Sequence, residues 1–376
     1  MKIGIIQPRI SYYPGGGEKT QIEYSKHLAW LGNEVVIYTL KAPHDKISHF
    51  YKDLLNEHIN KFEVKEFEIP EKYSFIFNQE PGEDRNRWDS ESLLFNQLIF
   101  NTLERDKPDI VISCYILDGI FRPISVPGIL HLSGYPVDKL EMRKSFLRFF
   151  DATISISNNV KDKWSEYLNE NRNNHVLNKG VDIIDGNSQF GSKYAKNIVF
   201  AGRLIERKGV VTLIESMRSL VGKYPELHLW ILGDGPQKDQ LLSLIKDKEL
   251  DKYIDLVGQT DKVFDYYRMA DICVFPSYEK EGLMGVVMEA MTVGKPVITT
   301  TNNGNEDIIE NGKTGILVEP RNEKQLTKSI DKLLSSPKLC REMGHKAKIY
   351  INNNHTWEIA TKKLVKILSE EIRNSG

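Results

Sequence analysis

The chain has 376 residues, of which 40% are hydrophobic and 27% are charged, and its formal net charge is −1. This length provides ample material for packed cores and suggests two domains or one large domain. The near balance of charge excludes a strong global attraction to nucleic acid or to an anionic membrane. Three widely spaced cysteines, Cys114, Cys273 and Cys340, have no metal-binding spacing and are interpreted as reduced thiols.

The sequence predicts neither a membrane-spanning helix nor a signal peptide. No run approaches the ~20 apolar residues that a spanning helix requires, and the first ten residues are too short and interrupted for a signal peptide. Residues 139–150 are basic, aromatic and amphipathic, so they fit either a helix packed on the core or a peripheral contact with a membrane. We therefore expect a cytoplasmic protein that can visit the inner face of the membrane.

The first half of the chain alternates apolar strands with helices. A strand is predicted over 2–7, followed by a glycine loop and by a helix over 18–32 that Gly32 ends. The other strands expected here are 34–40, 107–115, 127–133 and 151–157, with a helix near 90–105. Continuous apolar strands between helices indicate a parallel sheet that is covered on both faces.

The same alternation restarts after a polar, glycine-bearing linker over 184–197. Strands are predicted over 197–202, 227–233, 254–258, 271–277 and 296–300, with helices from Lys208, over 237–248, near 261–269 and over 284–294. The tail over 322–374 is largely helical. The pattern predicts a second doubly wound domain, in which ligands bind beyond the carboxyl ends of the strands.

The loop after the first strand contains Gly15, Gly16 and Gly17 and opens a helix. Glycine lets a backbone approach a ligand, and a helix N-terminus attracts phosphate. The spacing is not that of a dinucleotide fingerprint, and no acidic residue ends the second strand, so NAD binding is disfavoured. A loop that faces a ligand and a simple tight turn are the two interpretations that stay open.

Basic residues mark another strand end. Arg203 follows the strand that ends at Gly202, and Lys208 stands close to the next helix start. Two such cations can grip a diphosphate, although a solvated basic pair is the alternative. His131 ends a strand close to Gly134, where it fits either a site or a satisfied structural histidine.

Two glutamates surround an apolar segment. Glu281 follows a strand and precedes a helix, and Glu289 lies about two turns further along on a similar face. One carboxylate could hold a sugar hydroxyl and the other a ribose, while the backbone N–H groups of residues 283–286 could contact an anion. Two exposed helix carboxylates are a weaker interpretation, because the surrounding residues are apolar.

Taken together, these residues resemble the retaining glycosyltransferases of family GT4 (glycosyl transferases group 1). The resemblance covers nearly the whole chain. It rests on the early GGGE, on NKGVD, AGRLIERKG and ILGDGP, on the E-x7-E pair Glu281 and Glu289, and on EAMTVGKPVI, NGKTGILVEP and HTWE, all in the family's order. It implies a GT-B fold: an α/β protein whose two Rossmann-like, doubly wound parallel-sheet domains face each other across a cleft.

The resemblance also implies domain limits and roles. Residues 1–186 would form the acceptor-side domain, with helix 357–376 packed back on it, and 187–356 the donor-binding domain. Arg203 and Lys208 would contact the diphosphate, aided by amides near Gly16 and Gly17, and Glu289 would bind the ribose. Glu281 and His131 would hold the sugar, and the base would lie near Val257 and Gly258. Such enzymes usually need no metal or other cofactor, because fixed cations neutralise the leaving diphosphate.

One departure from the family stands beside the first glutamate. The family often has E-x-F-G, whereas this chain has Leu283 and Met284 before Gly285 and Val286. Since the glycine normally allows close approach to the donor, this difference bears on the donor contacts of residues 283–286 and on which sugar is bound. The fold does not depend on this difference.

The function that we expect is retaining transfer of a hexose-type sugar from a nucleotide-diphosphate sugar, UDP-sugar before GDP-sugar, to an acceptor hydroxyl. Bacterial surface polysaccharide or glycoconjugate synthesis is the expected context, with a glycan, a lipid-linked or a small-molecule acceptor and no nucleic acid. The alternatives are a non-catalytic nucleotide- or sugar-binding protein on the same fold and a glycoside hydrolase. The hydrolase is disfavoured because no second strand end offers a partner acid for Glu279 or Glu281.

Overall fold

A computed structural model of the chain describes every residue except 14, 79–84, 137–143, 169–171, 185, 187–191, 279–280 and 376, and it omits the side chains of 78, 85 and 86. The chain divides into two compact units. The first consists of Met1–Gly180 together with Trp357–Gly376, and the second is Val181–Thr356. The division at Gly180 falls slightly before the junction at 186 that the sequence suggested.

The first unit is built on a seven-stranded parallel sheet. Its strand order is β3-β2-β1-β4-β5-β6-β7, as in the Rossmann arrangement with one strand added. The strands are β1 Lys2–Ile6, β2 Glu34–Leu40, β3 Phe62–Phe67, β4 Ile110–Ser113, β5 Gly128–Leu132, β6 Ala152–Ser155 and β7 Asn173–Val176. The inner strands are continuous runs of buried β-branched residues, which is why they form the centre of a sheet covered on both faces.

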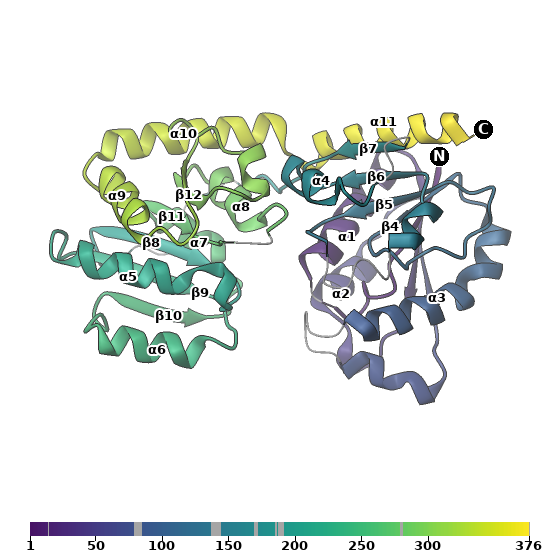
Figure 1. The fold of residues 1–376 in the computed structure, drawn as a ribbon, viewed down its shortest axis with the longest axis horizontal. Helices are drawn as coiled ribbons and strands as arrows, with labels where there is room; N and C mark the ends of the chain where they lie inside the picture. Colours follow the sequence, from purple (N-terminus) through teal and green to yellow (C-terminus); the bar gives the residue numbers. More distant parts are fainter. Residues whose placement is uncertain are drawn as a thin grey trace. The chain divides into compact units, whose positions relative to one another are not determined.

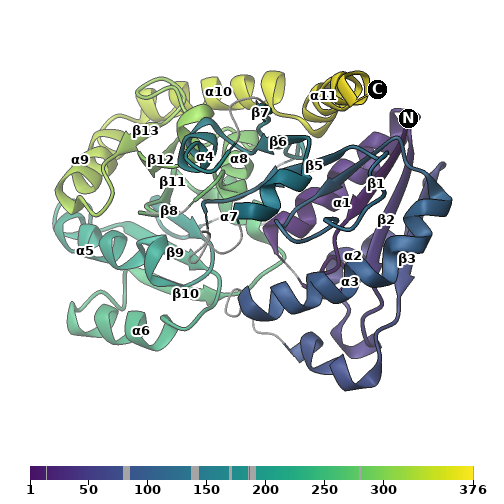
Figure 2. The same cartoon turned by 45° about the vertical axis from the view of Figure 1, so that its right-hand side comes forward.

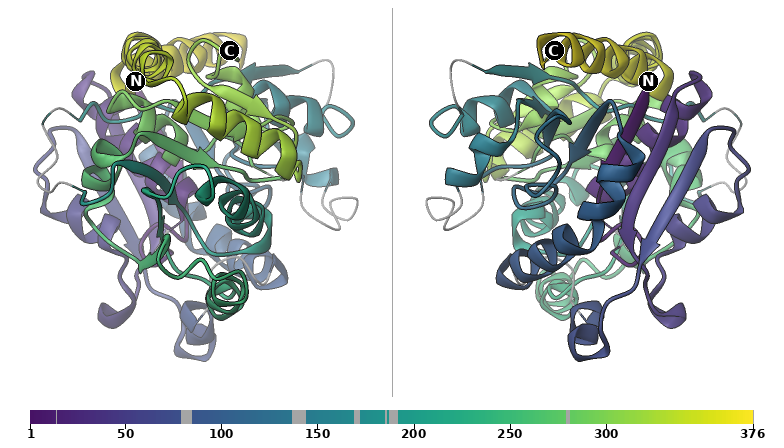
Figure 3. Two further views of the ribbon diagram at one scale, coloured as in Figure 1. Left: turned by 90° about the vertical axis from the view of Figure 1, so that its left-hand side faces the viewer. Right: turned by 90° about the vertical axis from the view of Figure 1, so that its right-hand side faces the viewer.

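Helices from both ends of the chain cover this sheet. They are α1 Gly16–Trp30, α2 His49–Asn56, α3 Arg85–Asp106, α4 Asn158–Trp164 and α11 Trp357–Ser375, with short 3₁₀ turns η1 His44–Lys46, η2 Glu71–Asn78 and η4 Lys144–Phe149. The C-terminal α11 lies beside α1, where Trp357 meets the Tyr24 ring edge-on at 5.3 Å between centroids (Figures 1 and 2). Leu364 and Leu368 complete the same core cluster. Both termini are marked near the top of each view in Figure 3, and Ser369 Oγ of the last helix reaches Met1 Sδ at 3.5 Å.

The second unit repeats the plan with a six-stranded parallel sheet of order β10-β9-β8-β11-β12-β13. Its strands are β8 Lys196–Ala201, β9 Leu227–Leu232, β10 Ile254–Gly258, β11 Ile272–Phe275, β12 Val297–Thr300 and β13 Ile316–Val318. Its helices are α5 Val210–Val221, α6 Lys238–Asp247, α7 Val263–Met269, α8 Gly285–Thr292, α9 Glu323–Leu334 and α10 Pro337–Asn354, with short turns η5 Glu206–Lys208 and η6 Gly304–Asp307.

The prediction of two doubly wound parallel-sheet α/β domains is confirmed. The differences lie at weakly apolar positions. Strand β3 was missed because its residues alternate charged and half-buried at one edge of the sheet, and β7 at the other edge because its residues are mostly polar and none is fully buried. The helix expected from Lys208 begins at Val210, and the helix expected over 284–294 is shorter, Gly285–Thr292.

Each sheet reverses its strand order at one point, between β1 and β4 in the first unit and between β8 and β11 in the second. Ligands of open α/β sheets bind beyond the carboxyl ends of the strands at such a switch point. The loops after β8 and β11 therefore define the place in the second unit where a site is expected, and the loops after β1 and β4 define it in the first.

A buried ionic cluster fills the switch point of the first unit. Arg9, which is 1% exposed, lies 2.5 Å from a carboxylate oxygen of Asp118 and 3.4 Å from one of Glu91. Ser92 bridges the two sides, since its Oγ lies 3.3 Å from Arg9 and donates to Asp118 at 2.6 Å. Burial raises the pKa of Asp118, and Arg9 opposes that rise. The cluster ties the loops after β1 and β4 to helix α3.

Candidate active site

Glycines bring three strand ends of the second unit to one edge. Gly233, after β9, has a φ of +127°, and a Cβ there would collide with the carbonyl oxygen of Gly202 after β8. The Gly233 N–H also donates to the carbonyl of Gly258 at 2.8 Å. The structure thus brings Val257 and Gly258, at the end of β10, to the same carboxyl edge as Arg203.

The loops after β8 and β11 are locked together at the switch point. Gly209 has a φ of +70°, which favours glycine, and a Cβ there would collide with the carbonyl oxygen of Pro276. Tyr278 N–H donates to the carbonyl of Arg207 at 2.9 Å. This close approach of two backbones positions the basic turn η5 against the loop that contains Glu281.

Two cationic side chains form ion pairs with one carboxylate where these loops meet. Lys208 Nζ lies 2.8 Å from Glu281 Oε1, and Arg207 Nη1 pairs with the same oxygen. Glu281 is only 8% exposed, and its carbonyl accepts from Gly304 N–H at 3.2 Å. The charges of Arg207 and Lys208 exceed that of Glu281 by one, so the group has a residual positive charge that suits an anion.

The sequence analysis paired Lys208 with Arg203 and overlooked Arg207. Arg203 is exposed in the same loop, and the structure places it beside β8 at the strand end as expected. Arg207 shares one segment with Lys208, but its partner Glu281 lies 74 residues away in sequence. A run of two basic residues in one short turn was the only available signal for its involvement.

The start of helix α8 differs from expectation. The amide of Met284 was expected among the anion contacts, but it donates to the Asn305 side chain at 3.0 Å. Gly285 and Val286 stand in the first turn of the helix, where an amide has no acceptor within the helix. Leu283 and Met284 are 7% and 5% exposed, so this departure from the family pattern packs into the core.

Glu289 lies half-buried on α8, one residue after the buried Met288. Burial raises the pKa of the Tyr267 phenol, and the charge of the nearby Glu289 adds to the rise. The carboxylate therefore lies near Tyr267 of α7. The two glutamates of the E-x7-E pair belong to one loop–helix segment at the carboxyl edge of the sheet.

The site residues predicted in the first unit also gather at a carboxyl edge. Helix α1 starts at Gly16 with no side-chain cap, so its first amides have no partner within the helix. A Cβ on Gly17 would lie 3.6 Å from Ser133 Oγ, just after β5. His131 is the next-to-last residue of β5, and its ring nitrogen Nδ1 lies 3.3 Å from Gln21 of α1.

Some expectations fall on parts of the chain that the structure does not describe. Glu279, the carboxylate considered for a hydrolase, is one of them, and so are residues 139–143 of the amphipathic segment. In the part of the chain that is described, no helix has the length and apolar character needed to cross a bilayer. Within that same part, no group of three or more histidine, cysteine or acidic side chains is arranged to hold a metal ion.

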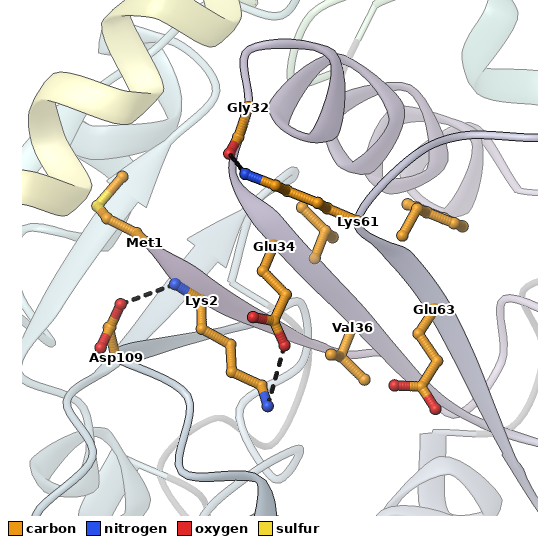
Figure 4. A pocket seen from close by; sticks show the side chains of 10 residues that line it. Met1, Lys2, Gly32, Glu34, Val36, Lys61, Glu63 and Asp109 are labelled. Carbon is orange, nitrogen blue, oxygen red and sulfur yellow. Dashed lines mark hydrogen bonds and ion pairs between the residues drawn. The ribbon is translucent and has the colours of Figure 1, made fainter.

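A groove at the opposite, amino end of the first sheet offers a different kind of surface (Figure 4). Its lysines bond within the groove: Lys2 Nζ lies 3.1 Å from Glu34, and Lys61 donates to the carbonyl of Gly32 at 3.2 Å. The backbone N–H of Lys2 donates to Asp109 at 2.7 Å. The groove lies at the wrong end of the strands for a switch-point ligand, and its polar groups serve the fold.

Replacing Gly209 by alanine should destabilise the second unit by about 1–3 kcal/mol, because a Cβ is strained at this φ and collides with the Pro276 carbonyl. Chemical denaturation would measure the loss. Gly222→Ala is the matched control: Gly222 has a φ of −66°, and a Cβ added there would meet no atom within 4 Å, so its stability should stay within about 0.5 kcal/mol of wild type. Equal stability of the two variants would contradict the proposed locking of the loops.

Solved structures of other proteins share this fold. The chain has a TM-score of 0.77 with Anabaena HepE in complex with UDP, at 17% identity, covering 98% of this chain and 100% of that one. The two parallel-sheet domains are therefore those of a GT-B fold, as expected.

Sequence comparisons agree with this class. Residues 187–350 match the family model described as "Glycosyl transferases group 1". A glycosyltransferase of Methanocaldococcus jannaschii, MJ1069, is 24% identical over 94% of each chain, and the Staphylococcus aureus capsular polysaccharide biosynthesis glycosyltransferase CapM is 26% identical over 70% of this chain and 72% of its own length. A Haemophilus influenzae glycosyltransferase is 27% identical over 53% of this chain, which spans 56% of that relative. These matches support a glycosyltransferase.

Proposed function

We propose that this chain is a retaining GT4-type glycosyltransferase that moves a hexose-type sugar from a nucleotide-diphosphate sugar to an acceptor hydroxyl. The observation that carries the proposal is the group formed by Arg207, Lys208 and Glu281 at the switch point of the second sheet. A diphosphate at this edge would meet Lys208 and Arg203, together with the amides of the first turn of α8. The complex of HepE with UDP, on the same fold, supports a UDP-sugar donor.

The remaining donor contacts follow from position. Glu289 on α8 would accept hydrogen bonds from the ribose, and the base would lie near Val257 and Gly258 at the end of β10. Glu281 would bind a hydroxyl of the sugar while its charge stays compensated by the two cations. Glu281 is only 8% exposed, and its ion pairs with Lys208 and Arg207 would hold this carboxylate in one orientation before the donor arrives.

In the reaction, the bond between the anomeric carbon and the diphosphate oxygen breaks as the carbon becomes oxocarbenium-like. Fixed positive charge from Arg203 and Lys208 would stabilise the leaving diphosphate, with no metal required for that role. The acceptor hydroxyl would then attack from the same face, and its proton would pass to the departing phosphate. His131 and the amides near Gly16 and Gly17 would contribute to the bound sugar and diphosphate from the first unit.

The acceptor is proposed to be a glycan or a lipid-linked glycoconjugate in bacterial surface polysaccharide synthesis. Support comes from the name of CapM, a capsular polysaccharide glycosyltransferase. A cytoplasmic enzyme with peripheral membrane contact would meet such an acceptor where it is assembled. The non-catalytic alternative is a nucleotide-binding protein with the same donor group and no transfer.

A thermal-shift screen with UDP, GDP and ADP tests the donor site. A nucleotide at about 100 times its dissociation constant should stabilise the protein by about 2.7 kcal/mol. We expect UDP to shift the wild type and to shift Glu289→Ala much less, because the ribose contact is lost. Lys324→Ala, at an exposed position of α9, is the control and should shift as wild type does. Absence of a shift with every nucleotide would refute the donor site, and a shift without sugar transfer would favour the non-catalytic alternative.

A further inference from the structure

The ring of His131 has two nitrogens in different surroundings. Nδ1 lies 3.3 Å from the side-chain amide nitrogen of Gln21, and both residues are at most 3% exposed. Nε2 is buried and has no hydrogen-bond partner within the part of the chain that the structure describes. A buried polar atom without a partner is uncommon in a folded protein and calls for a reason such as a ligand.

The contact with Gln21 decides which nitrogen is protonated. An amide nitrogen only donates hydrogen bonds, so Nδ1 must accept with its lone pair. Burial lowers the pKa of His131 to about 4, so the ring is neutral and has one proton near neutral pH. That proton must then be on Nε2, where it forms a donor without a partner among the described residues.

The surroundings of the ring keep this arrangement in place. The Tyr24 ring meets His131 edge-on at 6.2 Å between centroids, and Tyr24 and Gln21 come from the same helix, α1. Burial accounts for the lowered pKa of His131, and no charged side chain of the described residues contributes to it. The ring thus stands at the carboxyl end of β5, held by neutral contacts from one helix.

We propose that Gln21 is a positioning residue that fixes His131 in the Nε2–H tautomer, so that the ring presents a prepared hydrogen-bond donor to a hydroxyl of the transferred sugar. That a sugar hydroxyl is the partner of Nε2–H rests on the proposed function. The assignment of the tautomer rests only on contacts within the first unit. The tautomer and the sugar contact can therefore be refuted separately.

The tautomer is tested first by NMR on the full-length protein with ¹⁵N-labelled histidine. Among the nine histidines, the His131 signal is identified by its absence in His131→Gln. We expect the wild-type ring to carry its proton on Nε2, and Gln21→Met to lose that preference. Gln7→Met is the matched control, because Gln7 is equally buried but its amide faces Glu18, and it should leave the His131 tautomer unchanged. A wild-type proton on Nδ1, or an unchanged tautomer in Gln21→Met, would overturn the proposal.

The function of the tautomer is tested with Gln21→Glu. A carboxylate would accept from Nδ1–H, remove the proton from Nε2 in the neutral ring, and raise the pKa of His131. Loss of one hydrogen bond to the sugar should lower kcat/KM roughly two- to tenfold above that pKa. Below it, the imidazolium again has a proton on Nε2, so activity should recover as pH falls, whereas the wild type should not titrate in this range.

A shifted tautomer with unchanged kcat/KM at every pH would overturn the sugar as the partner of His131. If the wild type transfers no sugar at all, the proposed function fails, while the NMR result on the tautomer still stands. The two measurements therefore separate an error about Gln21 from an error about the reaction.

Discussion

The Lys208→Ala variant is expected to lose roughly 10²–10³-fold in kcat/KM for sugar transfer, the cost of removing one fixed contact to a developing negative charge. Lys208 Nζ lies 2.8 Å from Glu281, and its side chain is 16% exposed, so it is held at the strand end. A cation held in this way needs little rearrangement when the diphosphate leaves. Steady-state kinetics with the nucleotide sugar identified by the thermal-shift screen would measure the loss.

Two further variants show whether the positive charge of Lys208 accounts for the loss of kcat/KM. Lys208→Arg retains the charge and should lose much less activity than the alanine variant. Lys223→Ala also removes a lysine paired with a carboxylate, Asp331 at 2.6 Å, but at the far end of α5, and should keep wild-type activity. If Lys208→Ala keeps wild-type kcat/KM, Lys208 does not stabilise the leaving group, and Arg203 or Arg207 becomes the candidate.

The sequence located the candidate residues relative to the strands correctly, because strand ends are local features. Apolar runs identified β8, β10 and β11, and the residues that follow them were assigned to the carboxyl edge where the structure has them. What the sequence did not contain was the pairing between loops. Glu281 meets Arg207 across 74 residues, and the Met284 amide meets Asn305 across 21, and no local pattern encodes either contact.

The same distinction applies to the fold. Central strands are continuous apolar runs and were predicted, whereas the edge strands β3 and β7 lack that signal. The buried ionic cluster of the first unit was not predicted from the sequence. Arginine is usually a surface residue, and the partner of Arg9, Asp118, is 109 residues away. A fully buried arginine is rare unless it is paired, so only the tertiary structure shows that Arg9 is internal.

Replacing Arg9 by methionine should destabilise the first unit by about 3–5 kcal/mol, the cost of breaking a buried ion pair and leaving charge uncompensated. Asp118 and Glu91 are at most 1% exposed and would remain in the core without a counter-ion. The guanidinium also lies 4.7 Å from the centroid of the Trp88 ring, and that contact would be lost too. Urea denaturation, followed by tryptophan fluorescence, would measure the change.

The pH dependence identifies the cause of this loss. Burial already raises the pKa of Asp118, and without Arg9 the pKa of Asp118 should rise further. The folded variant would then bind protons that the unfolded chain has released, so its deficit should shrink as pH falls from about 7 to about 5. Adding Glu91→Gln and Asp118→Asn to Arg9→Met should recover much of the loss, and the exposed control Arg105→Met should change stability by less than about 0.5 kcal/mol. A deficit that is independent of pH and persists in the triple variant would show that Arg9 acts through packing, not through its charge.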